Sequence, residues 1–270
     1  MTPWILIALA FVFGGLALVR MGLGRRRRQR LLARPFSEEW RRILERNVPL
    51  VARLSAEKRQ RLEELIRAFL VDVPIEGGGG LEIDDEIRVT VAAQACLLVL
   101  GNGHSFPNLR SVVVYPEAYR AVNHDAGGDL VVSEHHRLGE SWSNGYVVLA
   151  WDAVRRGATN LNDGHNVVMH EFAHQLDQLD GDSDGIPVAA GRLRYGHWAR
   201  VVERDFEHLV ARVERNQRTV LDPYGAENPA EFFAVATEAF FERPKKLRRR
   251  YPELYALLED LYQLDPIAWH

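Results

Sequence analysis

The chain has 270 residues, of which 47% are hydrophobic and 26% are charged, and its formal net charge is −3. Residues 1–35 hold seven arginines and no acidic residue, so residues 36–270 carry about −10. An acidic part of 235 residues can bury one sizeable core and is a poor partner for nucleic acid. The single cysteine, Cys96, excludes an intramolecular disulfide and is expected to be a small buried hydrophobic residue.

The N-terminal segment predicts a membrane anchor. Residues 3–24 are apolar except for Arg20, and a run of about 20 such residues can span a bilayer. The basic run Arg25–Arg30 follows the apolar segment, whereas a cleavable signal peptide has its positive charge first. We therefore expect a transmembrane anchor over residues 1–24 and a polybasic juxtamembrane segment over residues 25–35. The positive-inside rule then predicts a single-pass membrane protein, with Arg25–Arg30 against inner-membrane lipid and the large domain in the cytoplasm.

The remaining domain, residues 36–270, has the pattern of an α+β fold in which helices surround a small mixed sheet. Apolar periodicity and start signals predict helices at 37–46, 55–71, 85–100, 163–179, 192–217, 228–242 and 251–262. Short β-branched runs predict strands at 110–115, 129–133 and 146–151.

The most informative motif is His170-Glu171-Phe-Ala-His174, which lies in the predicted helix 163–179. Residues four apart share a helix face, so His170 and His174 can bind one Zn²⁺ together. Glu171 lies on the flank of that face, where it can act as general base toward an attacking water. The pattern indicates a zinc peptidase of the H-E-x-x-H type.

A third protein ligand is required, and the candidate is Glu231 in the predicted helix 228–242. Asn228 is placed to cap this helix, with Pro229 at its first position. Glu231 would then be the third helical residue, where a glutamate can also reach back to the cap N–H group in a capping box. Spacing alone leaves both interpretations open.

Two further carboxylates could hydrogen-bond the metal-binding side chains and so orient them. Asp177 lies three residues after His174, and Glu238 lies about two turns after Glu231 on the same helix face.

A neighbouring segment, Asp180-Gly-Asp-Ser-Asp-Gly185, begins like a calcium loop. Its twelfth position holds Gly191 in place of glutamate, which favours a polar surface turn.

The chain resembles the Mlc titration factor A family of zinc-dependent peptidases of the glutamate-zincin type. The similarity runs from about Trp40 to the C-terminus. It is carried by His-Glu-Phe-Ala-His-Gln-Leu-Asp, Asp222-Pro-Tyr-Gly-Ala-Glu-Asn-Pro-Ala-Glu-Phe-Phe-Ala, Val114-Tyr-Pro116, Gly139-Glu-Ser-Trp142 and Val147-Val-Leu-Ala-Trp151. The resemblance implies zinc on His170, His174 and Glu231, Glu171 as general base, and Tyr224 in the active site with a hydroxyl that stabilises the oxyanion. The membrane anchor departs from the cytosolic members of the family.

The expected function is therefore membrane-anchored, zinc-dependent hydrolysis of peptide or protein substrates, with an aminopeptidase-like mode implied by the resemblance. Strand 146–151 precedes the zinc helix and is expected either to pair with the substrate backbone as an edge strand or to be a plain core strand. The alternative function is a regulatory protein that binds and sequesters a transcriptional repressor, with peptidase activity secondary. An intramembrane protease is excluded because the zinc motif lies in no apolar run of about 20 residues.

Overall fold

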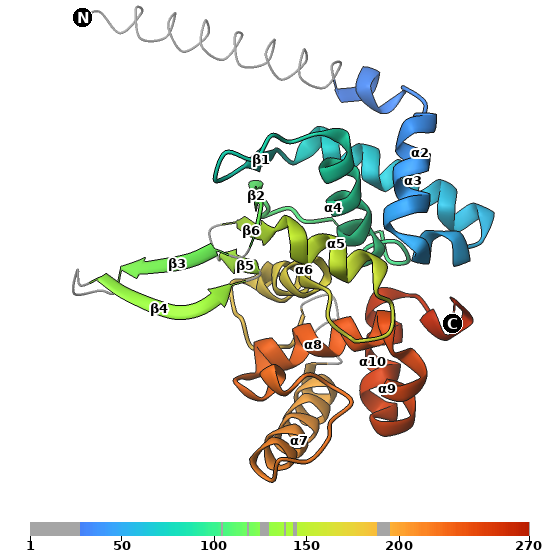
Figure 1. Cartoon of the computed structure of the whole chain (residues 1–270). Helices are drawn as coiled ribbons and strands as arrows, with labels where there is room; N and C mark the ends of the chain where they lie inside the picture. The colour runs from blue at the N-terminus through green and yellow to red at the C-terminus, as the bar shows by residue number, and fades with distance from the viewer. Residues whose placement is uncertain are drawn as a thin grey trace, which may run out of the picture.

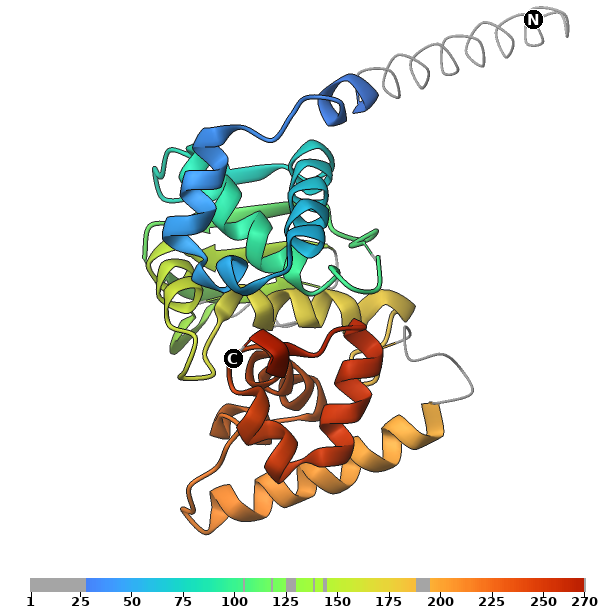
Figure 2. The same cartoon turned by 90° about the vertical axis from the view of Figure 1, so that its right-hand side faces the viewer.

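Helix α6 (Val167–Asp177) crosses the middle of the fold, between an N-terminal group of elements that contains the sheet and a C-terminal group of helices (Figures 1 and 2). The computed structural model describes residues 28–103, 105–117, 119–124, 130–137, 139–142, 145–187 and 195–269. The α+β class expected from the sequence is confirmed.

The larger sheet has the strand order β1-β2-β6-β5. Strands β1 (Ile75–Gly77), β2 (Ser111–Tyr115) and β6 (Tyr146–Ala150) are parallel, and β5 (Gly139–Trp142) is antiparallel to β6. Buried parallel strands are apolar on both faces, and Val112, Val114, Val147 and Leu149 are fully buried. A separate antiparallel hairpin of β3 (Tyr119–His124) and β4 (Leu130–Arg137) projects away from the body (Figure 1).

The position of β6 decides between the two interpretations of strand 146–151. β6 is hydrogen-bonded to β2 on one side and to β5 on the other, so it is a core strand and has no free edge for substrate. The outer strand beside α6 is β5, whose four residues alternate too little for sequence patterning to identify a strand.

The N-terminal helices cover the sheet. Helix α4 (Asp85–Leu97) is buried from Val89 to Leu97, and α2 (Glu38–Asn47) and α3 (Ala56–Asp72) pack on its outer side. The short 3₁₀ helix η1 (Pro49–Arg53) joins α2 to α3, and α5 (Trp151–Thr159) connects β6 to the loop before α6. Burial all round explains why α4 is mostly apolar from Val89 to Leu97, with Thr90 and Gln94 as its buried polar residues.

The C-terminal group is built around α8 (Pro229–Glu242), which packs directly on α6. Helix α7 (Tyr195–Glu214), the 3₁₀ helix η4 (Pro223–Ala226), α9 (Pro244–Arg250), α10 (Pro252–Tyr262) and η5 (Pro266–Trp269) surround it. Fully buried aromatic side chains of α8 fill this core, namely Phe232, Phe233, Phe240 and Phe241.

Polar caps set where the main helices begin. Each of the residues Ser37, Ser55, Asp84, Asn166 and Asn228 accepts a backbone N–H from the residue three positions later. Such a cap satisfies one of the otherwise unpaired donors of the first turn. The cap at Asn166 explains why α6 is shorter than the predicted helix 163–179, and Gly164, with φ of +75°, turns the chain just before it.

The predicted transmembrane span, residues 1–24, lies outside the described residues, and so do Arg25–Arg27 of the basic run. Among the residues that the structure does describe, no helix is both long enough and apolar enough to cross a membrane. The expectation of a single-pass membrane protein with a cytoplasmic domain is therefore corrected: the structure does not support it. Arg28, at the start of the described chain, forms an ion pair with Asp72 of α3 at 2.7 Å.

Gly101 is a close backbone contact between the two groups of elements. A Cβ atom at this position would lie 2.4 Å from the carbonyl oxygens of Tyr262 and Gln263, at the end of α10. Because the obstacle is backbone, Gly101→Ala is expected to lower the free energy of unfolding by about 1–3 kcal/mol. Denaturant unfolding measures this.

The matched control is Gly196→Ala in the first turn of α7, where a Cβ would meet nothing within 4 Å. Its free energy of unfolding should be unchanged or higher by up to about 1 kcal/mol, because alanine favours helix. Equal effects of the two substitutions would contradict a close approach at Gly101.

Candidate metal centre

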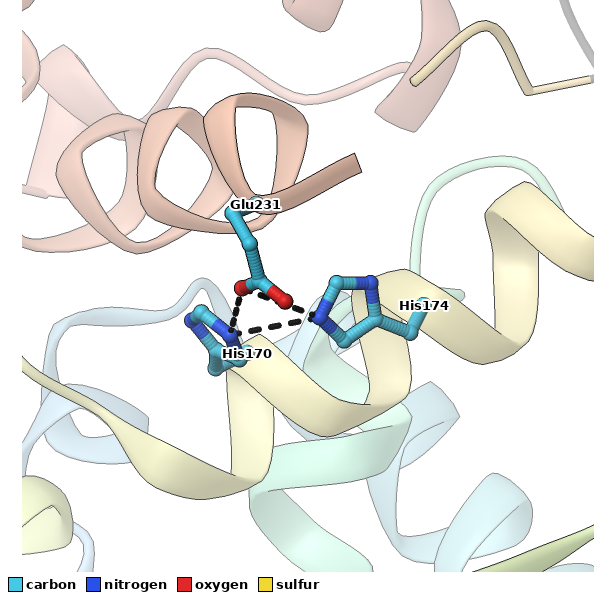
Figure 3. A group of neighbouring side chains, drawn as sticks. All are labelled: His170, His174 and Glu231. Carbon is cyan, nitrogen blue, oxygen red and sulfur yellow. Dashed lines mark hydrogen bonds and ion pairs between the residues drawn. The ribbon is translucent and has the colours of Figure 1, made fainter. Parts of the chain in front are cut away.

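Two histidines of α6 point out of the helix toward α8 (Figure 3). Val168, Phe172 and Ala173 are buried completely, which fixes the opposite face of the helix in the core. The Nε2 atoms of His170 and His174 are 3.3 Å apart, and the two side chains are 12% and 10% exposed. The helix therefore presents two imidazole nitrogens at one point near the surface.

Glu231 reaches the same point from the first turn of α8. Its Oε2 lies 2.9 Å from Nε2 of His170 and 3.4 Å from Nε2 of His174. The helix cap is made by the Asn228 side chain, which accepts the backbone N–H of Glu231 at 3.0 Å. The Glu231 carboxylate is thus directed at the histidines, and its backbone takes part in the cap.

These three residues fit a divalent metal ion. Their candidate ligand atoms all lie within 4.8 Å of one another, and no other such group of His, Cys, Asp or Glu occurs among the described residues. Ligands bound to one Zn²⁺ at about 2.0–2.2 Å in a tetrahedral arrangement are roughly 3.4 Å apart. Two imidazoles and one carboxylate also form the donor set of known catalytic zinc sites.

Without a metal, the protonation of His170 depends on the neighbouring carboxylates of Glu231 and Glu238. Burial works against the charged form of His170, but hydrogen bonds to Glu231 and Glu238 outweigh it and hold the His170 pKa well above its usual value. Burial likewise works against ionised Glu231, yet its contacts with both histidines lower the Glu231 pKa to about 2. A divalent cation on Nε2 of His170 would replace the proton shared with Glu231, while Nδ1 keeps its proton toward Glu238.

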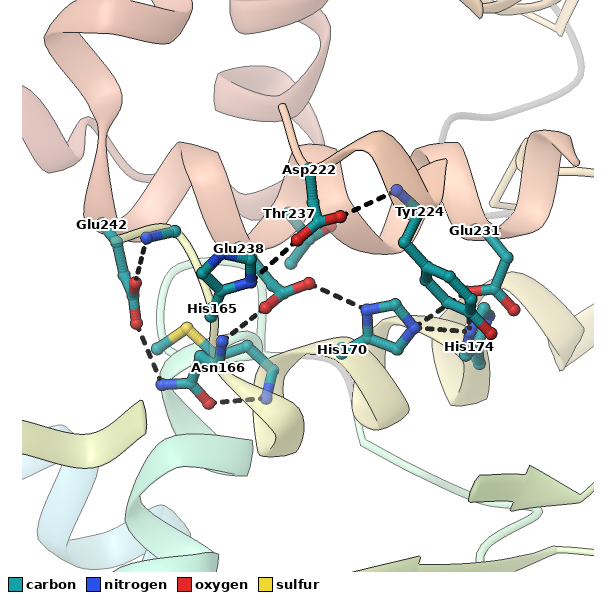
Figure 4. Close-up of polar contacts among 12 residues, drawn as sticks. His165, Asn166, His170, His174, Asp222, Tyr224, Glu231, Thr237, Glu238 and Glu242 are labelled. Carbon is teal, nitrogen blue, oxygen red and sulfur yellow. Dashed lines mark hydrogen bonds and ion pairs between the residues drawn. The ribbon is translucent and has the colours of Figure 1, made fainter. Parts of the chain in front are cut away.

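Glu238 supports His170 from behind. Its Oε1 lies 2.8 Å from Nδ1 of His170, and its Oε2 accepts the backbone N–H of Asn166 (Figure 4). A bond of this kind fixes the tautomer and the ring orientation of a metal-binding histidine, because it leaves Nε2 free for the metal. The structure therefore places Glu238 where the spacing on α8 suggested.

Glu242 extends the same row of carboxyl groups and was not anticipated from the sequence. It accepts the backbone N–H of Gly164 at 3.0 Å and the side-chain N–H of Asn166 at 3.3 Å (Figure 4). Burial, followed by the charge of Glu238, raises the pKa of Glu242 to about 9. The position four residues after Glu238 was the available signal, since both fall on one helix face.

Glu171 lies beside the histidines and is only 5% exposed. Burial raises its pKa to about 7, while the two histidines oppose this shift. Gly139 of β5 comes so close that a Cβ there would lie 2.5 Å from Glu171 Oε1 and from Val167. The absence of a side chain at Gly139 thus leaves room for the Glu171 carboxyl group next to the edge strand.

Tyr224 stands at the rim of the cluster on η4. Its side chain is 47% exposed and its ring centroid lies 5.9 Å from that of His170. Asp222 holds this turn, because it accepts the backbone N–H of Tyr224 at 2.7 Å and pairs with His165 at 2.9 Å. The loop before α6 is thereby tied to the loop that carries the tyrosine (Figure 4).

Asp177 is completely buried at the end of α6. Its Oδ2 accepts the backbone N–H of Gly185 at 3.1 Å and the hydroxyl of Ser183 at 3.5 Å, which anchors the loop after the helix. In the same loop Asp184 accepts bonds from Ile186 and Tyr195. A supporting role of Asp177 toward the metal ligands stays a prediction.

The buried carboxyl group of Glu242 generates a prediction about pH. Its pKa is about 9 in the folded protein and 4.5 ordinarily, so the folded chain keeps a proton that the unfolded chain releases. The resulting stability is complete below about pH 4.5 and is lost as the pH rises through about 9. Between pH 6 and 9, Glu242→Gln should flatten the fall in the free energy of unfolding by up to about 1.4 kcal/mol per pH unit.

Denaturant unfolding at several pH values checks this, with the exposed Glu227→Gln as control. The control should keep the wild-type slope. Parallel profiles for the wild type and Glu242→Gln would show that Glu242 is ionised in the folded protein.

Comparison with known proteins agrees with this centre. Residues 23–263 match the family model described as glucose-regulated metallo-peptidase M90. An uncharacterised protein of Synechocystis sp. is 40% identical, over 89% of this chain and 89% of its own length. Mlc titration factor A of Cronobacter sakazakii is 30% identical over 82% and 84%, and that of Pectobacterium atrosepticum is 30% identical over 86% and 88%. The chain belongs to the glucose-regulated metallo-peptidase M90 family.

Proposed function

We propose that this protein is a zinc-dependent peptidase in which His170, His174 and Glu231 hold the metal. The observation that carries the proposal is the meeting of two imidazole nitrogens and one carboxylate oxygen within 4.8 Å, on elements far apart in the sequence. Membership of a metallopeptidase family supports it. Zinc bound by these residues supplies Lewis acidity, which polarises a peptide carbonyl and lets water attack near neutral pH.

In the proposed reaction Glu171 moves the proton. Its buried carboxyl group, with a pKa near 7, is suited to accept a proton from the attacking water and to return it to the leaving amine. Tyr224 is exposed beside His170, where its hydroxyl can donate to the oxygen that becomes negative. Glu238 acts as a positioning residue, because it holds the ring of His170.

The substrate is proposed to bind as an extended peptide along β5. In the part of the chain that the structure describes, β5 pairs with β6 and with no other strand, and it contacts α6. Its outer edge can hydrogen-bond a peptide backbone, which gives affinity that depends little on the side chains of the peptide. An aminopeptidase-like mode is included in the proposal on the family resemblance.

A second function follows from the relatives' name, Mlc titration factor A. We propose as the alternative that the protein binds a transcriptional repressor and that peptidase activity is secondary. The substitution Glu171→Gln distinguishes the two functions. Repressor binding would be retained in this variant, whereas a biological effect that depends on hydrolysis would be lost.

The decisive variant for the peptidase is Glu171→Gln, which keeps the shape of the side chain and removes the base. Hydrolysis of a peptide library should fall by about 100-fold or more, the usual contribution of a general base. Zinc content and circular dichroism should stay at wild-type levels. Substrates with free and with acetylated N-termini, assayed in parallel, distinguish aminopeptidase from endopeptidase action.

The exposed Glu227→Gln makes the same chemical change outside the cluster and should keep full activity. Full hydrolysis by Glu171→Gln would show that Glu171 is not the general base. Hydrolysis by neither the wild type nor the control, in zinc-loaded protein, would favour the repressor-binding alternative.

A further inference from the structure

A cavity of about 560 Å³ lies at the far end of α8 from the metal centre. Its walls come from η1, the loop before α6, the junction of α8 with α9, and η5; the lining residues are Arg53, Asn162, Glu242, Arg243, Pro244, Lys245, Lys246 and Trp269. Glu242 is eleven residues after Glu231, which on a helix is about 16 Å. None of the residues proposed to bind zinc or move protons lines this cavity.

The lining is strongly basic in a part of the chain that is otherwise acidic. Four of its residues are cations, namely Arg53, Arg243, Lys245 and Lys246. Among the described residues, no carboxylate forms an ion pair with Arg243 or Lys246 within 4.0 Å, whereas Arg53 and Lys245 have further contacts. The one acid, Glu242, uses both oxygens to accept bonds from Gly164 and Asn166, and burial raises its pKa to about 9. At neutral pH Glu242 therefore offsets little of the positive charge of Arg243 and Lys246.

Two of these cations are held in place by backbone carbonyl groups. Arg243 donates from Nε to Asn162 and from Nη1 to Val220, both at 3.0 Å. Arg53 donates to the carbonyl of Trp269 at 3.1 Å. Fixed guanidinium groups lose little conformational freedom when a ligand binds, so the cavity is preorganised.

We propose that this cavity binds a small free anion that carries two or more phosphate charges. Its volume falls within the range of about 300–1,000 Å³ that is usual for small-molecule sites. Arginine and lysine bind phosphate through charge-assisted hydrogen bonds, and the two cations Arg243 and Lys246 match an anion with two or more charges better than a single carboxylate. This site is additional to the proposed peptidase, and its test does not depend on peptide hydrolysis.

The test is isothermal titration of the full chain with inorganic pyrophosphate at constant ionic strength. Lys246→Gln should weaken binding about tenfold, as expected for one charged hydrogen bond. Arg249→Gln is the matched control, because it removes one charge from an exposed position on the same helix α9 but outside the cavity. This control should bind pyrophosphate as the wild type does.

Arg243→Lys is a second, independent variant, which keeps the positive charge and removes the planar guanidinium group with its several N–H donors. It should also weaken binding, provided that its denaturant midpoint matches the wild type. Equal weakening by Lys246→Gln and Arg249→Gln would show diffuse attraction and overturn the site, as would the absence of pyrophosphate binding. Sedimentation with phosphatidylglycerol vesicles that Lys246→Gln reduces and Arg249→Gln does not, without binding of pyrophosphate, would assign the cavity to a lipid headgroup and contradict the proposed free anion.

Discussion

The carboxylate of Glu238 joins the two helices on which the metal centre depends. One oxygen contacts the ring of His170 and the other accepts the backbone N–H of Asn166, at the start of α6. Asn166 in turn caps α6 and reaches Glu242. The N-terminus of α6 is therefore fixed to α8 by polar contacts, and the histidines one turn later face Glu231 as a consequence.

Burying this row of carboxyl groups is costly, and the structure shows how each one is compensated. A buried carboxylate without partners would lose several kcal/mol of hydration. Glu238 and Glu231 instead contact histidines, and Glu242 keeps a proton to a higher pH than usual. The network is fully satisfied only when α6 and α8 are in register, so the same contacts that position the site also specify the packing of the two helices.

Much of the site could be predicted because its signals are local. The spacing of His170 and His174 and the cap at Asn228 are properties of single helices. Helix α8 begins after the predicted cap Asn228, and α6 lies within the predicted helix 163–179. The meeting of α6 with α8 depends on packing between segments some sixty residues apart, for which residue spacing on one helix carries no information. That limit explains why Glu231 could be either ligand or cap from spacing alone.

Other features of the fold were missed or wrongly predicted, because local sequence patterns do not determine them. Strand β5 is only four residues long and was missed, and the sequence left open whether β6 is an edge strand or a core strand; it is enclosed by β2 and β5. Helix α9 was missed because its basic sequence, Pro-Lys-Lys-Leu-Arg-Arg-Arg, buries little more than Leu247. An apolar N-terminal run predicted a membrane span, yet no described helix has the length and apolar character for one.

The most direct test of the account is the zinc content of the purified full chain, measured by elemental analysis for wild type, Glu231→Ala and Glu227→Ala. We predict about one zinc per chain in the wild type and in Glu227→Ala, and loss of zinc in a folded Glu231→Ala, since three protein ligands hold a catalytic zinc. Equal zinc in Glu231→Ala and the wild type would contradict the assignment of Glu231. A folded wild type that binds no zinc would contradict the metal centre itself.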